Sequence, residues 1–222
     1  MLRTLLEERF IEQEVDTRLY RLGPGVLELA QLFLKQNGIA DIAMPHLNQL
    51  RDQMGETVAL QILDGNETVC IAMSESRHPV RVTYYLGERM PAFCTSSGFV
   101  FLAGMSAATR KSILSKKLQK YTPKTIVDAV KIEAVIQDVT RKGIGFADES
   151  YIAGARGISA PIHGPNHEVI AVVTLVAPTQ RISLKQLAML VRPLKATADA
   201  ISADIARVGT IGSSLRRALV AG

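Results

Sequence analysis

Apolar side chains recur every three to four positions in several stretches of the chain, a spacing that predicts amphipathic helices. The longest such stretches cover residues 26–36, 41–54, 126–142 and 184–208, and shorter ones cover 96–105 and 109–117. Gly38 and Gly55 follow the first two stretches, at the position where glycine commonly ends a helix. The pattern therefore predicts six helices downstream of residue 25.

Elsewhere the apolar positions alternate with polar ones or form short continuous runs, which predicts strands. Residues 58–63 and 68–73 flank Asp64-Gly65, a dipeptide typical of a hairpin turn, and residues 157–162 and 169–176 flank a second turn at residues 164–167. Residues 80–85 are predicted to form a further strand, and residues 143–146 to restart extended structure. Strands grouped in hairpins between helices indicate an α+β fold with an antiparallel sheet.

The first 22 residues have a different organisation. Residues 2–9 have the pattern of the end of an amphipathic helix, and residues 10–12 and 19–22 those of two short strands joined by a polar turn. A helix followed by a β-hairpin is typical of the last part of a winged helix-turn-helix. The helix at residues 26–36 then connects this fragment to the larger unit.

Composition excludes several classes of protein. Of the 222 residues 47% are hydrophobic and 21% charged, so the chain can bury a core and is neither disordered nor collagenous. Two cysteines, Cys70 and Cys94, suit a reducing cytoplasm and exclude a disulfide scaffold. The longest apolar run, residues 169–177, is too short to cross a bilayer, and the N-terminus lacks a signal sequence. We therefore expect a cytoplasmic protein without a membrane partner.

The net charge of +5 permits nucleic-acid binding without demonstrating it. The basic surplus lies in residues 110–142, where scattered lysines usually form a solvated helix face. His163 and His167 have the spacing of a helical metal pair, but Gly164-Pro165-Asn166 makes the segment a turn. We expect no metal and no other cofactor.

A series of short motifs runs through the chain in a fixed order. They are Tyr20-Arg21-Leu22-Gly23, Gly55-Glu56-Thr57-Val58, Leu86-Gly87-Glu88-Arg89-Met90-Pro91, Ser97-Gly98-x-x-x-Leu102-Ala103, Gly143-x-Gly145-Phe146-x-Asp148-Glu149, Gly154, Ile158-Ser159-Ala160-Pro161-Ile162 and Ala177-Pro178-x-x-Arg181. Each motif is weak alone, but their order and spacing over most of the chain are specific. In these features the chain resembles the IclR family of bacterial transcription regulators.

The resemblance implies a winged helix-turn-helix that binds operator DNA, a linker helix and a GAF-like effector-binding domain, in homodimers or homotetramers that respond to a small metabolite. In this chain it implies a partial DNA-binding domain at 1–22, a linker at 23–38, an effector domain at 39–208 and a flexible tail at 209–222. Two departures stand out. The chain begins within what resembles the third helix of the DNA-binding domain, and Phe99 stands where the family usually has a lysine.

The candidate effector site starts at Ser96, Ser97 and Gly98, directly before an apolar helix. A helix N-terminus attracts anions, and these hydroxyls can either cap the helix or contact a carboxylate. The resemblance favours contact. Asp148 matches an acidic position that faces the effector in the family, although an aspartate that only caps a loop fits equally well.

Four further residues are assigned to the same cavity or its walls. Thr174 and Val176 share one face of a strand, and the resemblance implies that this face lines the pocket. The alternative is a threonine tolerated in a core strand. Ile158 and Cys94 are expected to line the same cavity, Cys94 as a small buried hydrophobe rather than a redox sensor.

The candidate DNA contacts are Arg3, Arg18 and Arg21 in the first 22 residues. Arginines of a wing can reach phosphates or the minor groove, but solvated hairpin arginines are an equally good interpretation.

The sequence thus favours a ligand-responsive DNA-binding regulator whose effector is a small organic acid. The alternative is a stand-alone ligand-binding or dimerisation module that has lost operator binding. An enzyme is not expected, because no nucleophile elbow, P-loop or dinucleotide-binding glycine motif is present in the sequence.

Overall fold

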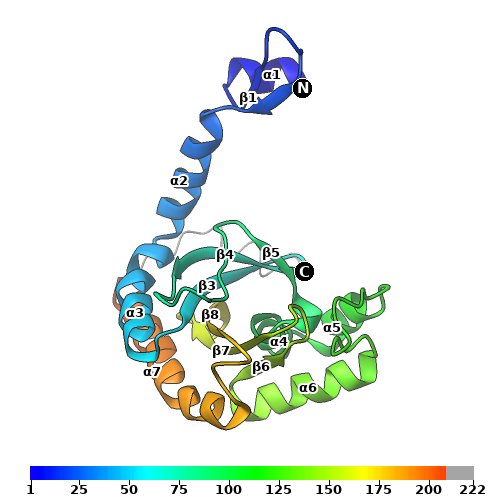
Figure 1. The fold of residues 1–222 in the computed structure, drawn as a ribbon, viewed down its shortest axis with the longest axis vertical. Coiled ribbons are helices and arrows are strands. Elements are labelled where there is room, and N and C mark those ends of the chain that lie inside the picture. Colours follow the sequence, from blue (N-terminus) through cyan, green and yellow to red (C-terminus); the bar gives the residue numbers. More distant parts are fainter. Residues whose placement is uncertain (209–222) are drawn as a thin grey trace.

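The structure, a computed structural model, describes residues 1–208, so the predicted flexible tail at 209–222 lies outside the described residues. The N-terminal fragment consists of α1 (Leu2–Glu7), β1 (Ile11–Gln13) and β2 (Tyr20–Leu22), with β1 and β2 paired antiparallel. It stands at the far end of helix α2 (Gly25–Asn37), away from the rest of the chain (Figure 1). The predicted sequence of helix, hairpin and connecting helix is confirmed.

Six antiparallel strands form the central sheet in the order β5-β4-β3-β8-β7-β6. Their bounds are β3 Thr57–Asp64, β4 Glu67–Ser74, β5 Arg89–Pro91, β6 Gly145–Asp148, β7 Ala155–His163 and β8 Val169–Pro178. The two predicted hairpins are β3-β4 and β7-β8, and they meet where β3 pairs with β8. The predicted α+β fold is confirmed. The short strand β5 was not predicted, because three residues are too few to show an apolar alternation.

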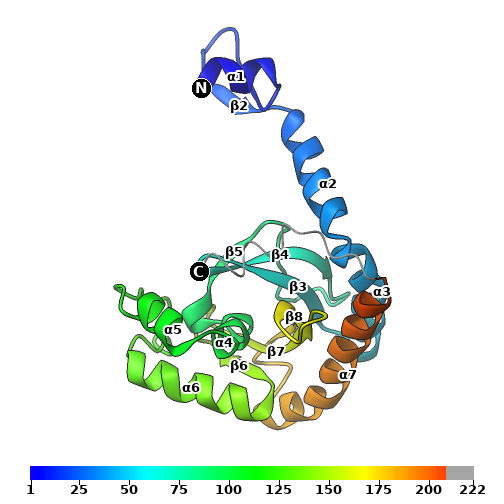
Figure 2. The ribbon, with the colours of Figure 1, turned by 180° about the vertical axis from the view of Figure 1, so that it is seen from behind.

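Helices cover both faces of this sheet (Figure 2). One face carries α3 (Ile39–Met54) and α7 (Leu184–Val208), which pack on each other and on the strands. The other carries α4 (Ser96–Ala103), with α6 (Ala129–Lys142) packed against α4 and α5 (Ala107–Leu114) beside them. Within residues 1–208 no helix is long and apolar enough to span a membrane.

The two faces differ in chemistry because successive strand residues point to opposite sides. On the α3/α7 side, Leu60, Ile158 and Leu175 belong to one large apolar cluster and are almost fully buried. On the α4 side, the alternate positions of the same strands include Gln61, Ser159 and Thr174. The polar positions therefore gather on the face that also carries the candidate site.

Residues 80–85 do not form the predicted strand. They belong to an irregular segment, residues 75–88. From outside this segment, Arg181 Nη1 donates to the carbonyl of Val80 at 2.9 Å. Within it, Glu88 Oε2 accepts from Tyr85 N–H at 2.9 Å. The alternation is real, because Val82 and Tyr84 pack inward against a small cluster on the α4 side. The backbone of residues 80–85 thus bonds to side chains, and the backbone bonds to strand β4 are made further on, by Gly87 and Glu88 with Cys70. The apolar pattern alone does not distinguish this arrangement from a strand.

Candidate functional site

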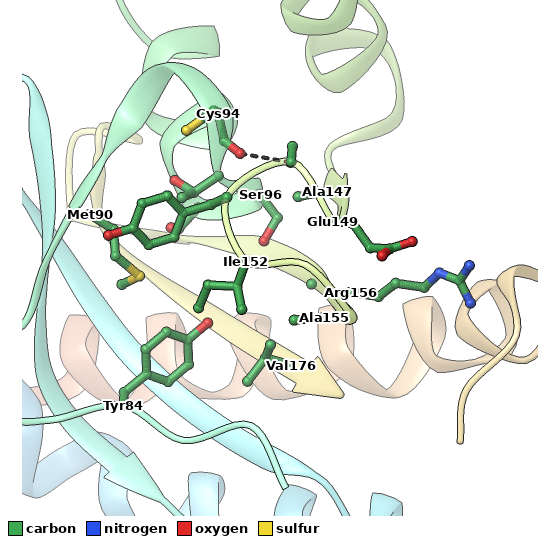
Figure 3. A pocket seen from close by; sticks show the side chains of 15 residues that line it. Tyr84, Met90, Cys94, Ser96, Ala147, Glu149, Ile152, Ala155, Arg156 and Val176 are labelled. Atoms are coloured by element: carbon green, nitrogen blue, oxygen red, sulfur yellow. Dashed lines mark hydrogen bonds between the residues drawn. The ribbon is translucent and has the colours of Figure 1, made fainter. Parts of the chain in front are cut away.

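A cavity lies where the N-terminus of α4 approaches strands β7 and β8, between the 75–88 segment and the turn at residues 149–154 (Figure 3). The cavity is small, with a free volume of about 40 Å³. Its walls are formed by Tyr84, Met90, Cys94, Thr95, Ser96, Ser97, Ala147, Glu149, Ser150, Tyr151, Ile152, Ala155, Arg156, Gly157 and Val176.

The start of α4 forms the polar end of the cavity. Thr95 caps the helix, since its Oγ1 accepts from Gly98 N–H at 3.2 Å and donates to the Pro91 carbonyl at 3.1 Å. A side chain at position 98 would collide with backbone, because a Cβ there would lie 2.0 Å from the Ala92 carbonyl oxygen. Thr95 and Gly98 thus serve the helix itself, and they leave the first-turn N–H groups and hydroxyls of Ser96 and Ser97 at the cavity wall.

Behind Ser96, a row of buried polar side chains crosses the sheet. Ser159 Oγ donates to Ser96 Oγ at 2.8 Å, Ser159 Oγ and Thr174 Oγ1 are 2.8 Å apart, and Thr174 Oγ1 donates to Gln61 Oε1 at 2.8 Å. Ser159, Thr174 and Gln61 are almost fully buried and do not line the cavity. Only Ser96 joins this row to the cavity.

Apart from Glu149 and Arg156, the other wall residues are apolar or neutral. Figure 3 shows the Tyr84 hydroxyl pointing into the cavity, opposite the start of α4. Burial, followed by the proximity of Cys70 and Glu88, raises the pKa of Tyr84, so its hydroxyl stays protonated. Burial also raises the pKa of Cys94 to about 12, so this thiol is neutral at physiological pH. The cavity can therefore offer hydroxyl donors but no thiolate.

Two charged residues, Glu149 and Arg156, belong to the wall, but their charged groups point away from the cavity (Figure 3). Arg156 Nε donates to Asp148 Oδ1 at 2.6 Å, and Lys124 Nζ bridges Asp148 Oδ2 at 3.0 Å and Glu149 Oε1 at 2.5 Å. Burial works to raise the pKa of Asp148, but hydrogen bonds from Lys124 and Arg156 outweigh it and lower that pKa. The Arg156 guanidinium also donates to the Ile182 carbonyl and points away from the cavity (Figure 3).

Cys94, Ser96, Ser97 and Val176 thus line the cavity as predicted from the sequence, whereas Gly98, Asp148 and Thr174 stand behind its wall. Whether any of them contacts an effector remains a prediction. The shared face of Thr174 and Val176 is confirmed, because both lie on the α4 side of β8.

The expectation for Ile158 was wrong. Ile158 lies in the apolar cluster under α3 and α7, on the opposite face of the sheet from the cavity. Its neighbours Gly157 and Ser159 take the α4 side, and Gly157 has to be small because a Cβ there would lie 2.8 Å from Ser96 Oγ. Because successive strand residues point to opposite faces of a sheet, Ile158 cannot face the cavity when Gly157 does.

Sequence reasoning missed several wall residues, notably Tyr84, Met90, Tyr151 and Ile152. Tyr84 was assigned to a strand, so nothing suggested that its hydroxyl would reach a cavity. The other three lie in the short strand β5 and in an irregular turn, where no periodicity marks a face. Met90 belongs to one of the family motifs, and Tyr151 and Ile152 closely follow another at Asp148-Glu149, which was the one signal that could have indicated them.

The N-terminal fragment that carries the three arginines stands at the far end of α2, away from the sheet and helices that form the cavity (Figure 1). Arg3 pairs with Glu7 at 2.8 Å and Arg21 with Glu12 at 2.8 Å, and all four side chains are exposed. Arg18 lies in the connection between β1 and β2 with a positive φ of 57°, and it forms no ion pair with the residues up to 208. All three arginines are exposed on the surface of this fragment.

Comparison with known proteins identifies the fold. The family model of the bacterial transcriptional regulator IclR C-terminal domain matches residues 31–203. The Pca regulon regulatory protein of Pseudomonas putida is 30% identical over 174 residues, which are 78% of this chain and 60% of that protein. This chain therefore matches less than two thirds of that relative.

Two solved structures extend the likeness. The Thermotoga maritima IclR structure has a TM-score of 0.78 at 25% identity, covering 92% of this chain and 83% of that one. An IclR homologue of Microbacterium hydrocarbonoxydans, solved with 4-hydroxybenzoate, has a TM-score of 0.80 at 24% identity, covering 93% and 83%, and shows the shared fold. Since the family model covers most of the chain, this protein belongs to the IclR family of bacterial transcriptional regulators.

Proposed function

We propose that residues 39–208 are the effector-sensing domain of a DNA-binding transcription regulator, and that the cavity at the start of α4 binds a small organic acid. The observation that carries this proposal is the composition of the cavity wall. The hydroxyls of Ser96 and Ser97 and the positive end of a buried helix lie at one end, and Met90, Ile152 and Val176 form apolar walls. A carboxylate at the polar end and a carbon skeleton at the apolar walls match this arrangement.

The balance of charge also supports an acid. Arg156, the one cationic residue in the wall, is already paired with Asp148 and points away. The N–H groups at a helix start can stabilise an anion without a neighbouring cation. A cationic ligand would find no free carboxylate in this wall, because the Glu149 carboxylate points away from the cavity and is paired with Lys124.

The free cavity sets the size of the ligand. Its small volume suits a compact acid such as pyruvate, whereas an aromatic acid needs outward movement of a wall. The turn at residues 149–154 is a wall without regular secondary structure, and the relative solved with 4-hydroxybenzoate motivates the aromatic alternative. Both sizes belong in the test.

We further propose that residues 1–22 contribute to DNA binding and that residues 23–38 link the two parts in a homodimer or homotetramer. Helix α2 exposes large apolar side chains along its length, with Leu27 70%, Leu29 51% and Leu32 53% exposed. A second copy of the helix would cover such a surface. Arg18 and Arg21 on the hairpin, with Arg3 on α1, are the proposed phosphate contacts.

Calorimetric titration of the full chain with pyruvate, benzoate, 4-hydroxybenzoate and the neutral 4-hydroxybenzyl alcohol tests the effector proposal. We expect saturable binding of at least one acid and a Ser96→Ala or Ser97→Ala loss of about 5- to 30-fold, which corresponds to about 1–2 kcal/mol for one lost hydrogen bond. Binding of the alcohol in preference to all three acids would contradict the proposal.

Fluorescence anisotropy on labelled DNA from the upstream region of its own gene, against scrambled DNA at two salt concentrations, tests the regulator proposal. Preferential binding that weakens steeply with salt is the expected result. Equal affinity for both DNAs would contradict a sequence-specific role for residues 1–22 and support the alternative of a ligand-binding module.

A further inference from the structure

We infer that Gln61, Thr174 and Ser159 form a hydrogen-bond relay that directs the hydroxyl proton of Ser96 into the cavity, so that Ser96 donates to a carboxylate ligand. Gln61 is then a positioning residue of a site that it does not touch. This inference rests on the proposed effector site and adds the means by which the site selects an acid.

The first step is a count of protons. The row contains three oxygen–oxygen contacts of 2.8 Å, from Ser96 to Ser159, from Ser159 to Thr174 and from Thr174 to Gln61. Each contact needs one proton, and each hydroxyl has only one to give. Three hydroxyls can therefore fill the three contacts only if Ser96 turns its own proton inward, towards Ser159.

The geometry of the first contact points the other way. Ser159 Oγ is the donor and Ser96 Oγ the acceptor. Ser159 has then used its proton, so Thr174 has to donate to Ser159. Thr174 then cannot also donate to Gln61 Oε1, the direction that the amide requires in its present orientation. The third contact is filled only when the Gln61 amide makes a half-turn and offers Nε2 in place of Oε1.

This arrangement gives one consistent direction, from Gln61 through Thr174 and Ser159 to Ser96. The Ser96 proton is then the only hydroxyl proton in the row without an acceptor inside it, and of the four residues Ser96 alone lies in the cavity wall. A ligand carboxylate supplies the missing acceptor. The half-turn of Gln61 gives up only a weak contact, from Nε2 to Met90 Sδ at 3.9 Å.

Burial makes the direction of the relay matter. Gln61 and Ser159 are 0% exposed and Thr174 is 1% exposed, so water cannot supply a proton or an acceptor at any of the three. In such surroundings a misdirected hydroxyl leaves a contact without a proton, which is costly, and aligned hydrogen bonds strengthen one another. A ligand that accepts a hydrogen bond from Ser96 is therefore coupled to the amide of Gln61, which lies on β3, two strands away from Ser159 on β7.

Thr174 variants test the relay, because Thr174 lies two contacts from the ligand. Thr174→Val keeps the shape of the side chain and removes the hydroxyl, whereas Thr174→Ser keeps the hydroxyl. We expect Thr174→Val to weaken binding of the best acid among pyruvate, benzoate and 4-hydroxybenzoate about 3- to 10-fold, and Thr174→Ser to stay within twofold of wild type. Thermal melts confirm that both variants are folded.

A double-mutant cycle separates a relay from a direct contact. In a Ser159→Ala background, Thr174→Val should cause no further loss, because the path to Ser96 is already broken. Binding of 4-hydroxybenzyl alcohol through its hydroxyls should change less than binding of the acid. An undiminished loss in the Ser159→Ala background would overturn the relay and indicate that Thr174 contacts the ligand itself.

The two proposals fail differently. If wild type binds an acid but Thr174→Val binds it equally well, the relay is wrong and the effector site stands. If wild type binds none of the acids, the effector site is wrong and the relay falls with it.

Discussion

The two faces of the central sheet are made by the same strands and have opposite roles. Towards α3 and α7 the strands present an apolar layer of aliphatic side chains, including Leu60 and Leu175, both 0% exposed. Towards α4, the residues one position away on the same strands include Gln61 and Thr174, equally buried but joined by hydrogen bonds. Burial alone therefore does not distinguish a structural position from a position that serves the site; the chemistry of the buried group does.

The difference has an energetic basis. Burying an aliphatic side chain stabilises the fold directly, whereas burying a hydroxyl or amide costs free energy unless it is hydrogen-bonded. The row of four such groups, Gln61, Thr174, Ser159 and Ser96, therefore does not stabilise the fold in the way that a hydrophobic core does. On the face towards α4, hydrogen bonds within the row offset this cost, next to the candidate site.

The largest expected effect is on the apolar face. Leu175→Ala should lower the free energy of unfolding by about 3 kcal/mol, because it opens a cavity in the cluster under α3 and α7. Thr174→Val, one residue away, should cost less, about 1–2 kcal/mol. Urea unfolding monitored by circular dichroism measures both, with Val130→Ala at a 79% exposed position as the control. A larger loss for Thr174→Val would reverse the proposed roles of the two faces.

The next effect concerns the thiols on the α4 side. Burial raises the pKa of both Cys70 and Cys94 to about 12, so the reactive thiolate is scarce at pH 8. Alkylation of the folded protein by iodoacetamide should be roughly a hundredfold or more slower than alkylation of the chain in urea, where both cysteines react. Mass spectrometry follows the two sites separately. Rapid labelling of Cys94 in the folded chain would show that the cavity wall opens readily.

The smallest effect concerns the charged groups behind the wall. Lys124 and Arg156 hold the pKa of Asp148 below its usual value, so this carboxylate adds stability that is lost as the pH falls through the lowered pKa. Asp148→Asn should reduce the free energy of unfolding by about 1 kcal/mol or less at pH 7, and the difference from wild type should shrink below about pH 4. A difference that is independent of pH would show that the ion pairs contribute nothing to stability.

The sequence predicted the regular elements well where one face of an element is apolar. The final helix occupies residues 184–208 as expected, because its apolar positions repeat with the helical period over its whole length. The strand prediction for residues 80–85 was wrong because inward-facing Val82 and Tyr84 produce the same alternation in a segment without a partner strand.

The site was predictable only in part, for reasons that are local. Ser96 and Ser97 were found because they lie at the start of an apolar helix, a feature that the sequence shows directly. Ile158 was placed on the wrong face because the orientation of β7 depends on the fit of Gly157 against Ser96. The pairing of Asp148 with Arg156 follows from the register of β6 and β7, which the spacing of residues does not reveal.

The most direct test of the central claim, that the α4 face of the sheet binds a small organic acid, is a calorimetric titration of three proteins with the same acid. These are wild type, Ser96→Ala at the cavity wall and Ser112→Ala at an exposed position on α5. The account predicts a loss of about 5- to 30-fold for Ser96→Ala and no change for Ser112→Ala. Equal affinity of all three proteins for the acid would place its binding site elsewhere and contradict the account.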